Sequence, residues 1–241
     1  MIALEALRGL PEVRPGDDLA ALLAECATEL RAGDVLVIAH KVVSKAEGRV
    51  VRLADVEPSP RAVELAAEHG KDPRAIEVIL SEATELVRAD AGRLICRTRH
   101  GFVCANAGVD ASNAGAPDTV VLLPLDPDAS ARALRERLGC AVVISDSFGR
   151  AWRKGQCEVA IGCAGLVPLR DYRGEPDTDG RDMRASVIAI ADEAAAAADL
   201  ARGKTSREPA VRVRGLERFV LEDDGPGAAE LVRAWADDLF R

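Results

Sequence analysis

The sequence predicts an α+β fold, in which strands and helices are mixed without the strict alternation of a doubly wound sheet. At 241 residues the chain is long enough to bury a full core. Hydrophobic residues make up 48% of it but aromatic residues only 3%, so Ala, Val and Leu must fill that core. We detect no internal repeat and no linker that would force a boundary, and we expect a single domain over residues 1–241.

The overall charge of the chain points to small-molecule chemistry. A formal net charge of −8 and a pI near 5.1 disfavour a nucleic-acid binder, which needs a surplus of basic residues. No apolar stretch approaches the roughly 20 residues of a membrane span, and Met1 opens no signal-peptide pattern. We therefore expect a cytoplasmic protein without nucleic-acid or membrane partners.

The cysteines stand singly in apolar runs, without the CxxC pair or the Cys/His spacing of a zinc site. This pattern favours reduced thiols in the core, with a catalytic thiol as the alternative. The six are Cys26, Cys96, Cys104, Cys140, Cys157 and Cys163.

The N-terminal elements follow from turn and capping signals. Residues 1–10 predict a strand, and Asp17 or Asp18 can cap a helix over 19–30 that stops by Gly33.

The next segment, 34–46, is predicted as one buried strand, because it is rich in β-branched residues and nearly uncharged before His40 and Lys41. A polar turn at 47–48 then leads to a strand over 49–53.

Two amphipathic helices are predicted over 60–70 and 74–87, each opened by a proline. Residues 93–108 predict a hairpin that turns at 100–101 and runs into a polar loop over 109–118.

The second half of the chain opens with a capped helix over 126–139, which feeds a strand over 141–147. Residues 185–203 predict the longest helix, ending near Gly203. The rest is predicted as an apolar segment over 157–172, a polar turn-rich stretch over 173–183, a strand over 210–216 and a final helix over 227–240.

Two aspartates follow strand patterns in the same way. Asp110 comes just after GFVCANAGV and Asp146 just after AVVIS, so each presents a carboxylate at a strand end. Mg²⁺ and Mn²⁺ prefer one or two such carboxylates with phosphate oxygens and water, and the hydroxyls and amide of Ser112, Asn113 and Ser147 can complete the shell. The alternative reading, turn residues or helix caps, is equally open.

Basic residues stand near these positions. Lys45 lies at the end of the predicted strand, within reach of a phosphate, and follows His40 and Lys41. A solvated surface lysine is the commoner alternative. A second basic group in SFGRAWRKGQ suits carboxylates or phosphates, or is a plain surface loop; it comprises Arg150, Arg153 and Lys154.

Familiar nucleotide and hydrolase motifs are missing from the sequence. It contains no GxxxxGK[ST], no GxGxxG after a strand and no GxSxG. From the residues alone we predict an α+β enzyme with a metal and phosphate site of a less familiar kind.

Five segments read in order, SKAEGR, GFVCANAGVDASN, LLPLDPDASA, SDSFGRAWRKG and AIGCAGL, resemble the coenzyme F420:γ-glutamyl ligase family. The likeness extends over positions 9–215, and the N-A-G-V-D-x-S-N and D-[ST]-x-G-R blocks are its most specific parts. Actinobacterial relatives carry a similar domain fused to a nitroreductase-like partner; we expect no such partner here.

The resemblance implies an interlocked two-part α+β fold that forms homodimers, with the nucleotide in a groove near the dimer interface. It implies GTP-dependent addition of L-glutamate to the lactyl carboxylate of coenzyme F420-0 through an acyl phosphate, with further γ-linked glutamates left open. The implied cofactors are Mg²⁺ or Mn²⁺, two ions per site, and K⁺ is left open.

Carried over position by position, the resemblance implies that Asp110, Asp146 and Ser147 are metal ligands and that Asp110, Asp146 and Lys45 are catalytic. The implied nucleotide-binding residues are Leu10, Pro11, Glu12, Val13, His40, Lys41, Lys45, Asn113, Gly203 and Lys204. From charge we add the hypothesis that Arg150, Arg153 or Lys154 holds the substrate's phosphodiester or the incoming glutamate.

Two departures from the family pattern stand out. Residues 177–183 lack the tyrosine of the D-L-Y-G-R-E-L found in many relatives, and Lys204 replaces an acidic or amide residue that supports a second metal in some archaeal relatives. Two alternatives stay open: a ligase of the same fold for a modified side chain, and a protein that only binds GTP or the deazaflavin.

Overall fold

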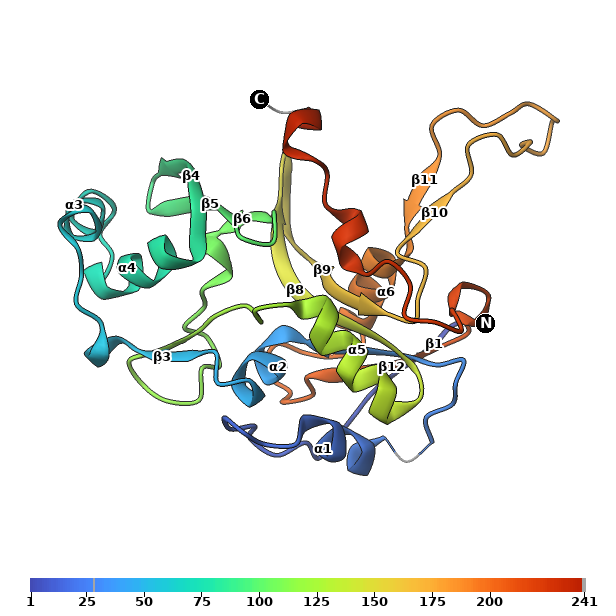
Figure 1. Ribbon diagram of the computed structural model, residues 1–241, viewed down its shortest axis with the longest axis horizontal. Coiled ribbons are helices and arrows are strands. Elements are labelled where there is room, and N and C mark those ends of the chain that lie inside the picture. Colours follow the sequence, from blue (N-terminus) through green and yellow to red (C-terminus); the bar gives the residue numbers. More distant parts are fainter. Residues whose placement is uncertain (28, 240–241) are drawn as a thin grey trace.

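A mixed five-stranded sheet forms the centre of the molecule (Figure 1). The computed structural model describes residues 1–27 and 29–239. The strand order is β1-β12-β2-β8-β9, in which β2 and β8 run parallel and the other neighbours are antiparallel. The bounds are Ala3–Ala6 for β1, Ala210–Arg214 for β12, Val35–Ala39 for β2, Ala141–Arg150 for β8 and Arg153–Ala164 for β9.

Both faces of this sheet are covered by helices. Leu36 and Ile38 of β2 pack in one core with residues of α1 (Leu19–Cys26) and α5 (Pro127–Leu138). The alternate residues Val35 and Val37 pack in a second core with α6 (Ile190–Asp199). A strand that is buried on both faces needs apolar residues throughout, which explains the uninterrupted run of β2.

A smaller lobe lies beside the central sheet and has a core of its own. It contains α3, α4, a three-stranded sheet β4-β5-β6 and the pair β3-β7. The bounds are Pro60–His69 for α3, Pro73–Glu82 for α4, Ala83–Asp90 for β4, Arg93–Thr98 for β5, Val103–Ala105 for β6, Val50–Arg52 for β3 and Thr119–Val121 for β7. The mixture of sheets and helices confirms the predicted α+β class.

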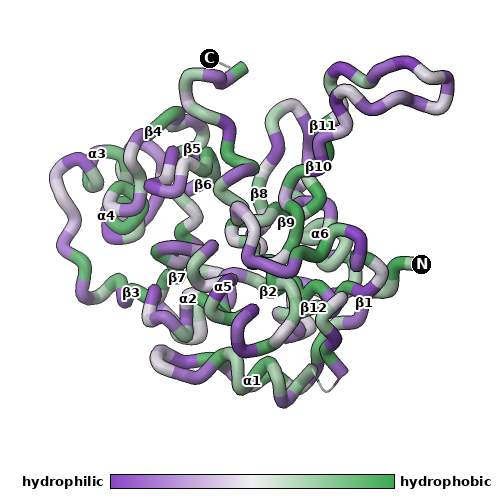
Figure 2. Tube along the Cα trace, turned by 45° about the vertical axis from the view of Figure 1, so that its right-hand side comes forward, coloured by the Kyte–Doolittle hydropathy of each residue, from purple (hydrophilic) through white to green (hydrophobic). Residues whose placement is uncertain are grey.

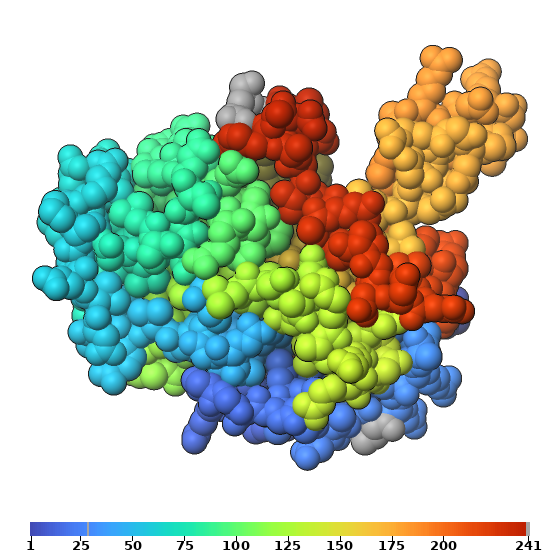
Figure 3. Space-filling view, viewed as in Figure 1, coloured from blue at the N-terminus to red at the C-terminus, as the bar shows by residue number. Residues whose placement is uncertain are grey.

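A third feature is a hairpin arm built on β10 (Leu169–Asp171) and β11 (Val187–Ala189). Its long connection projects from the body of the molecule (Figures 1 and 3) and is mostly hydrophilic (Figure 2). The polar stretch predicted over 173–183 lies in this connection. None of the helices among the described residues is long and apolar enough to cross a membrane.

The prediction of one strand over 34–46 is wrong in its second half. β2 ends at Ala39 and the chain continues as the helix α2 (His40–Ala46). His40 Nδ1 lies 3.3 Å from Ser44 Oγ one helical turn away, and Val43 packs in the core beneath α1 and α5. Tertiary packing has overridden the β-branched composition that suggested a strand.

Three predicted helices are too long. The helix over 19–30 ends at Cys26, α4 ends at Glu82 where β4 begins, and the helix over 185–203 is reduced to α6 because β11 precedes it. Thr28 lies outside the described residues. The predicted strand over 141–147 is in turn too short, because β8 pairs with β9 as far as Arg150.

The final helix predicted over 227–240 is replaced by two short 3₁₀ turns, Ala228–Leu231 and Trp235–Asp237. The carboxylate of Asp128 accepts the N–H groups of Ala228 and Ala229 at 2.7 and 3.1 Å. Farther along, the Arg97 guanidinium lies 4.4 Å from the centre of the Trp235 ring. These contacts hold the segment extended against the body. Residues 240–241 lie outside the described part.

Candidate functional site

Asp146 lies on β8, just beyond the point where its parallel neighbour β2 ends. The register between β2 and β8 ends at the pair Ala39 and Ser145, after which β2 turns into α2. The Asp146 side chain, 16% exposed, therefore faces the first residue of that helix, and its Oδ1 lies 3.3 Å from His40 Nε2. The Ser147 N–H donates to the same oxygen at 2.8 Å.

The surroundings keep this buried carboxylate charged. Burial by itself raises the pKa of Asp146, but His40, the Ser147 N–H and Lys41 together hold that pKa below its usual value. The sequence predicts Asp146 at the end of a strand. It lies where the pairing of β8 with β2 ends, although β8 continues beside β9.

Asp110 lies on the small lobe, in the loop between β6 and β7. Its backbone N–H and C=O bond with Val121 at 3.1 and 2.9 Å, which fixes its place in the lobe. Lys41 Nζ donates to Asp110 Oδ2 at 2.7 Å and to the Ser112 oxygens O and Oγ at 2.9 and 2.6 Å. The Ser112 N–H donates back to Asp110 Oδ1 at 2.7 Å, the local bond that a turn residue makes.

Burial raises the pKa of Asp110, but the hydrogen bonds and charge of Lys41 and the bonds from Ser112 outweigh it, and the net shift is downward. The neighbouring Asn113 is exposed and has φ +54°. His40 contacts Asp146 and the next residue, Lys41, bonds Asp110, so both predicted aspartates contact the first turn of α2. The charge of Lys41 also lowers the pKa of Asp146.

The donors gathered here are two carboxylates and the serine hydroxyls. Among the described residues no group of three or more His, Cys, Asp or Glu side chains is arranged to hold a metal ion. A metal at this place would therefore depend on Asp110, Asp146 and hydroxyl or phosphate oxygens. Mg²⁺ is commonly held in this way by few protein ligands.

A buried ionic cluster that sequence reasoning missed adjoins Ser147. Glu158 on β9, whose side chain is 3% exposed, accepts hydrogen bonds from Ser147 Oγ and, at 2.8 Å, from Arg202 Nη2. Lys204 Nζ contacts Ser147 Oγ and lies 3.5 Å from Glu158 Oε1. The available signal was a single acidic residue within the apolar run CEVAIGCA.

Lys45 lies in the last turn of α2, not at the end of a strand as predicted. Its Nζ, on a side chain 8% exposed, bonds Glu12 Oε1 at 2.5 Å. Gly115, with φ +92°, lies against this pair, and a Cβ there would be 3.1 Å from the Glu12 oxygen. The segment around Glu12, α2 and the loop after β6 therefore meet at one edge. Leu10 and Val13 pack on the core, whereas Pro11 is exposed.

The predicted basic group lies elsewhere. Arg150, Arg153 and Lys154 occupy the tip of the β8–β9 hairpin, where Arg150 Nη2 bonds the Lys154 carbonyl at 2.8 Å. Among the described residues no hydrogen bond or ion pair joins their side chains to Asp110 or Asp146. Trp152 at this tip is 88% exposed and has φ +61°.

The predicted thiols are free, as expected, with no disulfide in the described residues. Four are buried and two, Cys26 and Cys157, are partly exposed. Burial, with a smaller effect of Asp146, raises the pKa of Cys104 to about 12. A neutral thiol of this kind is a poor nucleophile.

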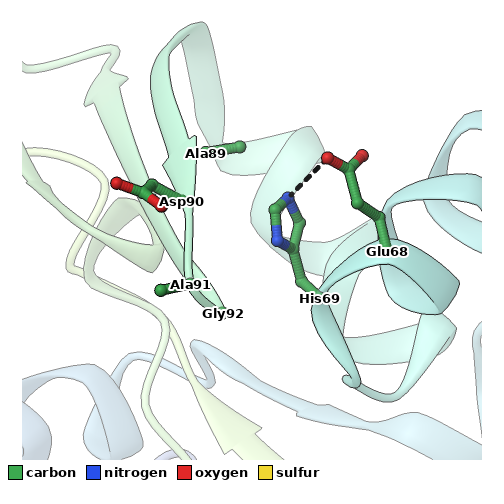
Figure 4. Close-up of a pocket in the computed structure, with 6 residues that line it drawn as sticks. All are labelled: Glu68, His69, Ala89, Asp90, Ala91 and Gly92. Atoms are coloured by element: carbon green, nitrogen blue, oxygen red, sulfur yellow. Dashed lines mark ion pairs between the residues drawn. The ribbon is translucent and has the colours of Figure 1, made fainter.

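A separate cavity of about 410 Å³ lies in the small lobe between the end of α3 and the β4–β5 turn (Figure 4). Its one interacting pair is Glu68 Oε1 and His69 Nε2, 4.0 Å apart, whereas Asp90 points away from the ring. No predicted site residue lines this cavity.

Comparison with known proteins identifies the family. The model of the F420-0:Gamma-glutamyl ligase family matches residues 9–215. The chain belongs to the F420-0:gamma-glutamyl ligase family. This confirms the resemblance read from the motifs, and the matched span contains every candidate residue from Leu10 to Lys204.

Individual members of the family match over nearly the whole chain. A Coenzyme F420:L-glutamate ligase of Methanopyrus kandleri is 49% identical over 238 residues, which is 95% of this chain and 94% of the relative. The proteins of that name from Methanothermobacter thermautotrophicus and Halobacterium salinarum are 44% and 43% identical. They cover 100% and 97% of this chain and 99% and 98% of their own lengths.

Proposed function

We propose that this member of the family attaches L-glutamate to the lactyl carboxylate of coenzyme F420-0 at the expense of GTP. The names of the relatives support the glutamate and the deazaflavin acceptor. The observation that carries the proposal is that Asp110 and Asp146, two carboxylates with lowered pKa values, contact the consecutive residues Lys41 and His40 at the start of α2. Carboxylates with neighbouring lysines suit a magnesium or manganese nucleotide.

The residues fit a divalent ion. Asp110, Asp146 and the Ser147 hydroxyl are hard oxygen donors. The positively charged ammonium of Lys41 bonds Asp110 and Ser112, so these oxygens already hold one cationic group. A bound Mg²⁺ or Mn²⁺ would neutralise negative charge on the phosphates of the nucleotide. Two ions per site, a K⁺ ion, the interlocked two-part arrangement and the homodimer stay predictions from the resemblance.

The chain's own residues would bind and orient the reactants. Lys45 and Lys41 supply positive charge for the phosphates, and the exposed Glu12 must give up Lys45 when a phosphate arrives. A lactyl carboxylate oxygen attacks the γ-phosphorus and GDP leaves, which forms an acyl phosphate. The glutamate amine, after losing a proton, attacks the acyl carbon and inorganic phosphate leaves. Positioning and electrostatics supply the acceleration, because no covalent enzyme intermediate is needed.

The direct test is an omission assay. Purified protein is incubated with F420-0, GTP, L-glutamate and Mn²⁺ or Mg²⁺, and the products are identified by mass spectrometry. We expect a product heavier by one or more glutamyl units, absent when GTP, glutamate or metal is omitted and strongly reduced for Asp146→Asn.

Other results would point to the two alternatives. Unchanged F420-0 under every metal condition, with GTP still bound, would indicate a binding protein or a ligase for a modified side chain. Glutamylation of a phosphoglyceryl analogue but not of F420-0 would select the second. For the hairpin-tip residues Arg150, Arg153 and Lys154, substitutions that leave both Michaelis constants unchanged would reject a role in holding substrate.

A further inference from the structure

Glu158 is a buried charged residue directly behind the proposed site. It faces Ser147 across the β8–β9 ladder, and its side chain is only 3% exposed. Its two carboxylate oxygens have different neighbours. Oε2 accepts from Arg202 at 2.8 Å, whereas Oε1 accepts from Ser147 Oγ and lies 3.5 Å from Lys204 Nζ. One oxygen thus faces the scaffold and the other faces the site.

Arg202, the partner of Glu158 Oε2, is itself buried and held by several hydrogen bonds. The Arg202 side chain is 6% exposed and donates to Ser145 Oγ at 3.1 Å, to the Pro209 carbonyl at 3.0 Å and to Asp199 Oδ1 at 3.3 Å. These partners lie on β8, before β12 and at the end of α6. Arg202 therefore fixes Glu158 through its Oε2 oxygen and leaves Oε1 for Ser147 and Lys204.

The other oxygen of Glu158, Oε1, lies near Lys204, a residue whose exposed side chain would otherwise be mobile. Lys204 is 67% exposed, and a solvated lysine samples many rotamers. Its ammonium is nevertheless directed to two oxygens, Ser147 Oγ and Glu158 Oε1, both of them fixed by the sheet. A charged hydrogen bond to a buried partner restricts such a side chain.

We propose that Glu158 is a positioning residue that holds the Lys204 ammonium and the Ser147 hydroxyl toward a polyphosphate. The inference rests on the proposed function for the identity of that ligand. Glu158 does not touch the substrate; it acts through its two neighbours, much as outer carboxylates orient ligands in metal sites. The sequence alone gives no reason to expect it, because Lys204 lies 46 residues farther along the chain.

The first experiment measures the position of Lys204 without any ligand. Reductive methylation of the folded protein with formaldehyde is followed residue by residue by mass spectrometry, with the exposed Lys154 as the internal reference. We expect Lys204 to react more slowly than Lys154 in the wild type and at a similar rate in Glu158→Gln. Glu158→Asp, which keeps the charge opposite Arg202 but withdraws the carboxylate, should give the same increase if the Gln variant does not fold.

A matched control separates positioning from plain destabilisation. Glu82 is also buried and accepts hydrogen bonds from two arginines, Arg49 at 2.7 Å and Arg99 at 3.1 Å, in the small lobe. Glu82→Gln should lower the melting temperature and leave the methylation of Lys204 unchanged. An equal methylation rate of Lys204 in the wild type and both Glu158 variants would overturn the proposal.

The second experiment measures nucleotide binding with a fluorescent GTP analogue in a double-mutant cycle. Lys204→Ala should weaken binding roughly tenfold in the wild type, as expected for one lost charged contact, and much less in the Glu158→Gln background. Equal losses in both backgrounds would overturn the proposal. If the wild type binds no GTP analogue, the proposed function fails, and the methylation experiment still decides whether Glu158 positions Lys204.

Discussion

The two sides of the candidate site are built in different ways. The sheet side consists of Asp146 and Ser147 on β8 with Glu158 behind them, and it rests on paired strands and buried charges. The loop side consists of Asp110, Ser112 and Asn113 in the exposed connection after β6, where one lysine side chain and local turn bonds fix the carboxylate. The sheet side is therefore preorganised, whereas the loop side depends on what occupies the space beside it.

This contrast has a chemical meaning. Lys41 donates three hydrogen bonds to the loop side, so an incoming cation must compete with its ammonium for Asp110. Among the described residues, Asp146 contacts His40 Nε2 at 3.3 Å and accepts the Ser147 N–H, while Lys41 acts on it through its charge. We expect Asp146, which bonds no ammonium in the described part of the chain, to receive a cation first and the loop side to rearrange around it.

The largest expected difference is in backbone mobility. Amides of β8 that pair with β2 should exchange hydrogen on the order of a thousandfold more slowly than those of residues 111–118, because a central strand opens only with the fold. Hydrogen exchange read by mass spectrometry checks this. GTP with Mn²⁺ should slow exchange in the loop and leave β8 unchanged; slowing confined to β8 would reverse the assignment of the two sides.

The next effect concerns catalysis. Asp146→Asn should reduce glutamate ligation on the order of 100-fold or more, because it removes the preorganised charge. Asp110→Asn should cost less, about 10-fold, since Ser112 remains nearby to offer oxygen donors. Initial rates by mass spectrometry, with melting temperatures as the control for folding, give the comparison. A larger loss for Asp110→Asn would contradict the account.

A smaller effect concerns the pH dependence of stability, through the buried thiol of Cys104. Burial and Asp146 raise the pKa of Cys104, on β6, to about 12 in the folded protein, against 9.0 for the free thiol. A raised pKa contributes stability that is complete below pH 9 and is lost as the pH rises toward 12, by about 1.4 kcal/mol per pH unit.

Urea unfolding of the wild type and Cys104→Ala checks this prediction. The stability difference between the two proteins should stay constant between pH 7 and pH 8 and shift in favour of the variant above pH 9. A difference that is independent of pH up to 10.5 would contradict the burial of this thiol beside Asp146.

The smallest effect tests the edge where Glu12 covers Lys45. Glu12→Gln should tighten binding of a fluorescent GTP analogue about threefold, because an exposed carboxylate no longer competes with phosphate for Lys45. Lys45→Ala should weaken binding in the same titration. Weaker binding by Glu12→Gln would mean that the Glu12 side chain itself supports the nucleotide.

Several helix ends and the β5–β6 hairpin could be predicted from the sequence, because local signals decide them, whereas the start of β4 falls inside a predicted helix. Ser59 and Asp126 each accept an N–H group from the first turn of α3 and α5, and Gly70 and Gly139 end these helices with positive φ. The hairpin of β5 and β6 follows its predicted turn.

Tertiary contacts account for what the sequence could not predict. The β-branched valines of α2 predict a strand, yet packing in one core with α1 and α5 fixes this segment as a helix. The C-terminal segment has the composition of a helix but is held extended by Asp128 and Trp235. In the site, Asp110 and Asp146 could be predicted because each follows a strand pattern in the sequence. The ion pair of Glu158 and Arg202 could not, because the two residues lie far apart in the sequence and meet only in the folded chain.

The most direct test of the central claim is a Mn²⁺ titration with GDP present, followed by electron paramagnetic resonance, on the wild type, Asp110→Asn and Asp146→Asn. In the proposed site, one nucleotide-bound metal ion is held by both the sheet side and the loop side. We predict saturable Mn²⁺ binding in the wild type, weaker binding in Asp110→Asn and none in Asp146→Asn at the same concentrations. Binding as tight in Asp146→Asn as in the wild type would contradict the account.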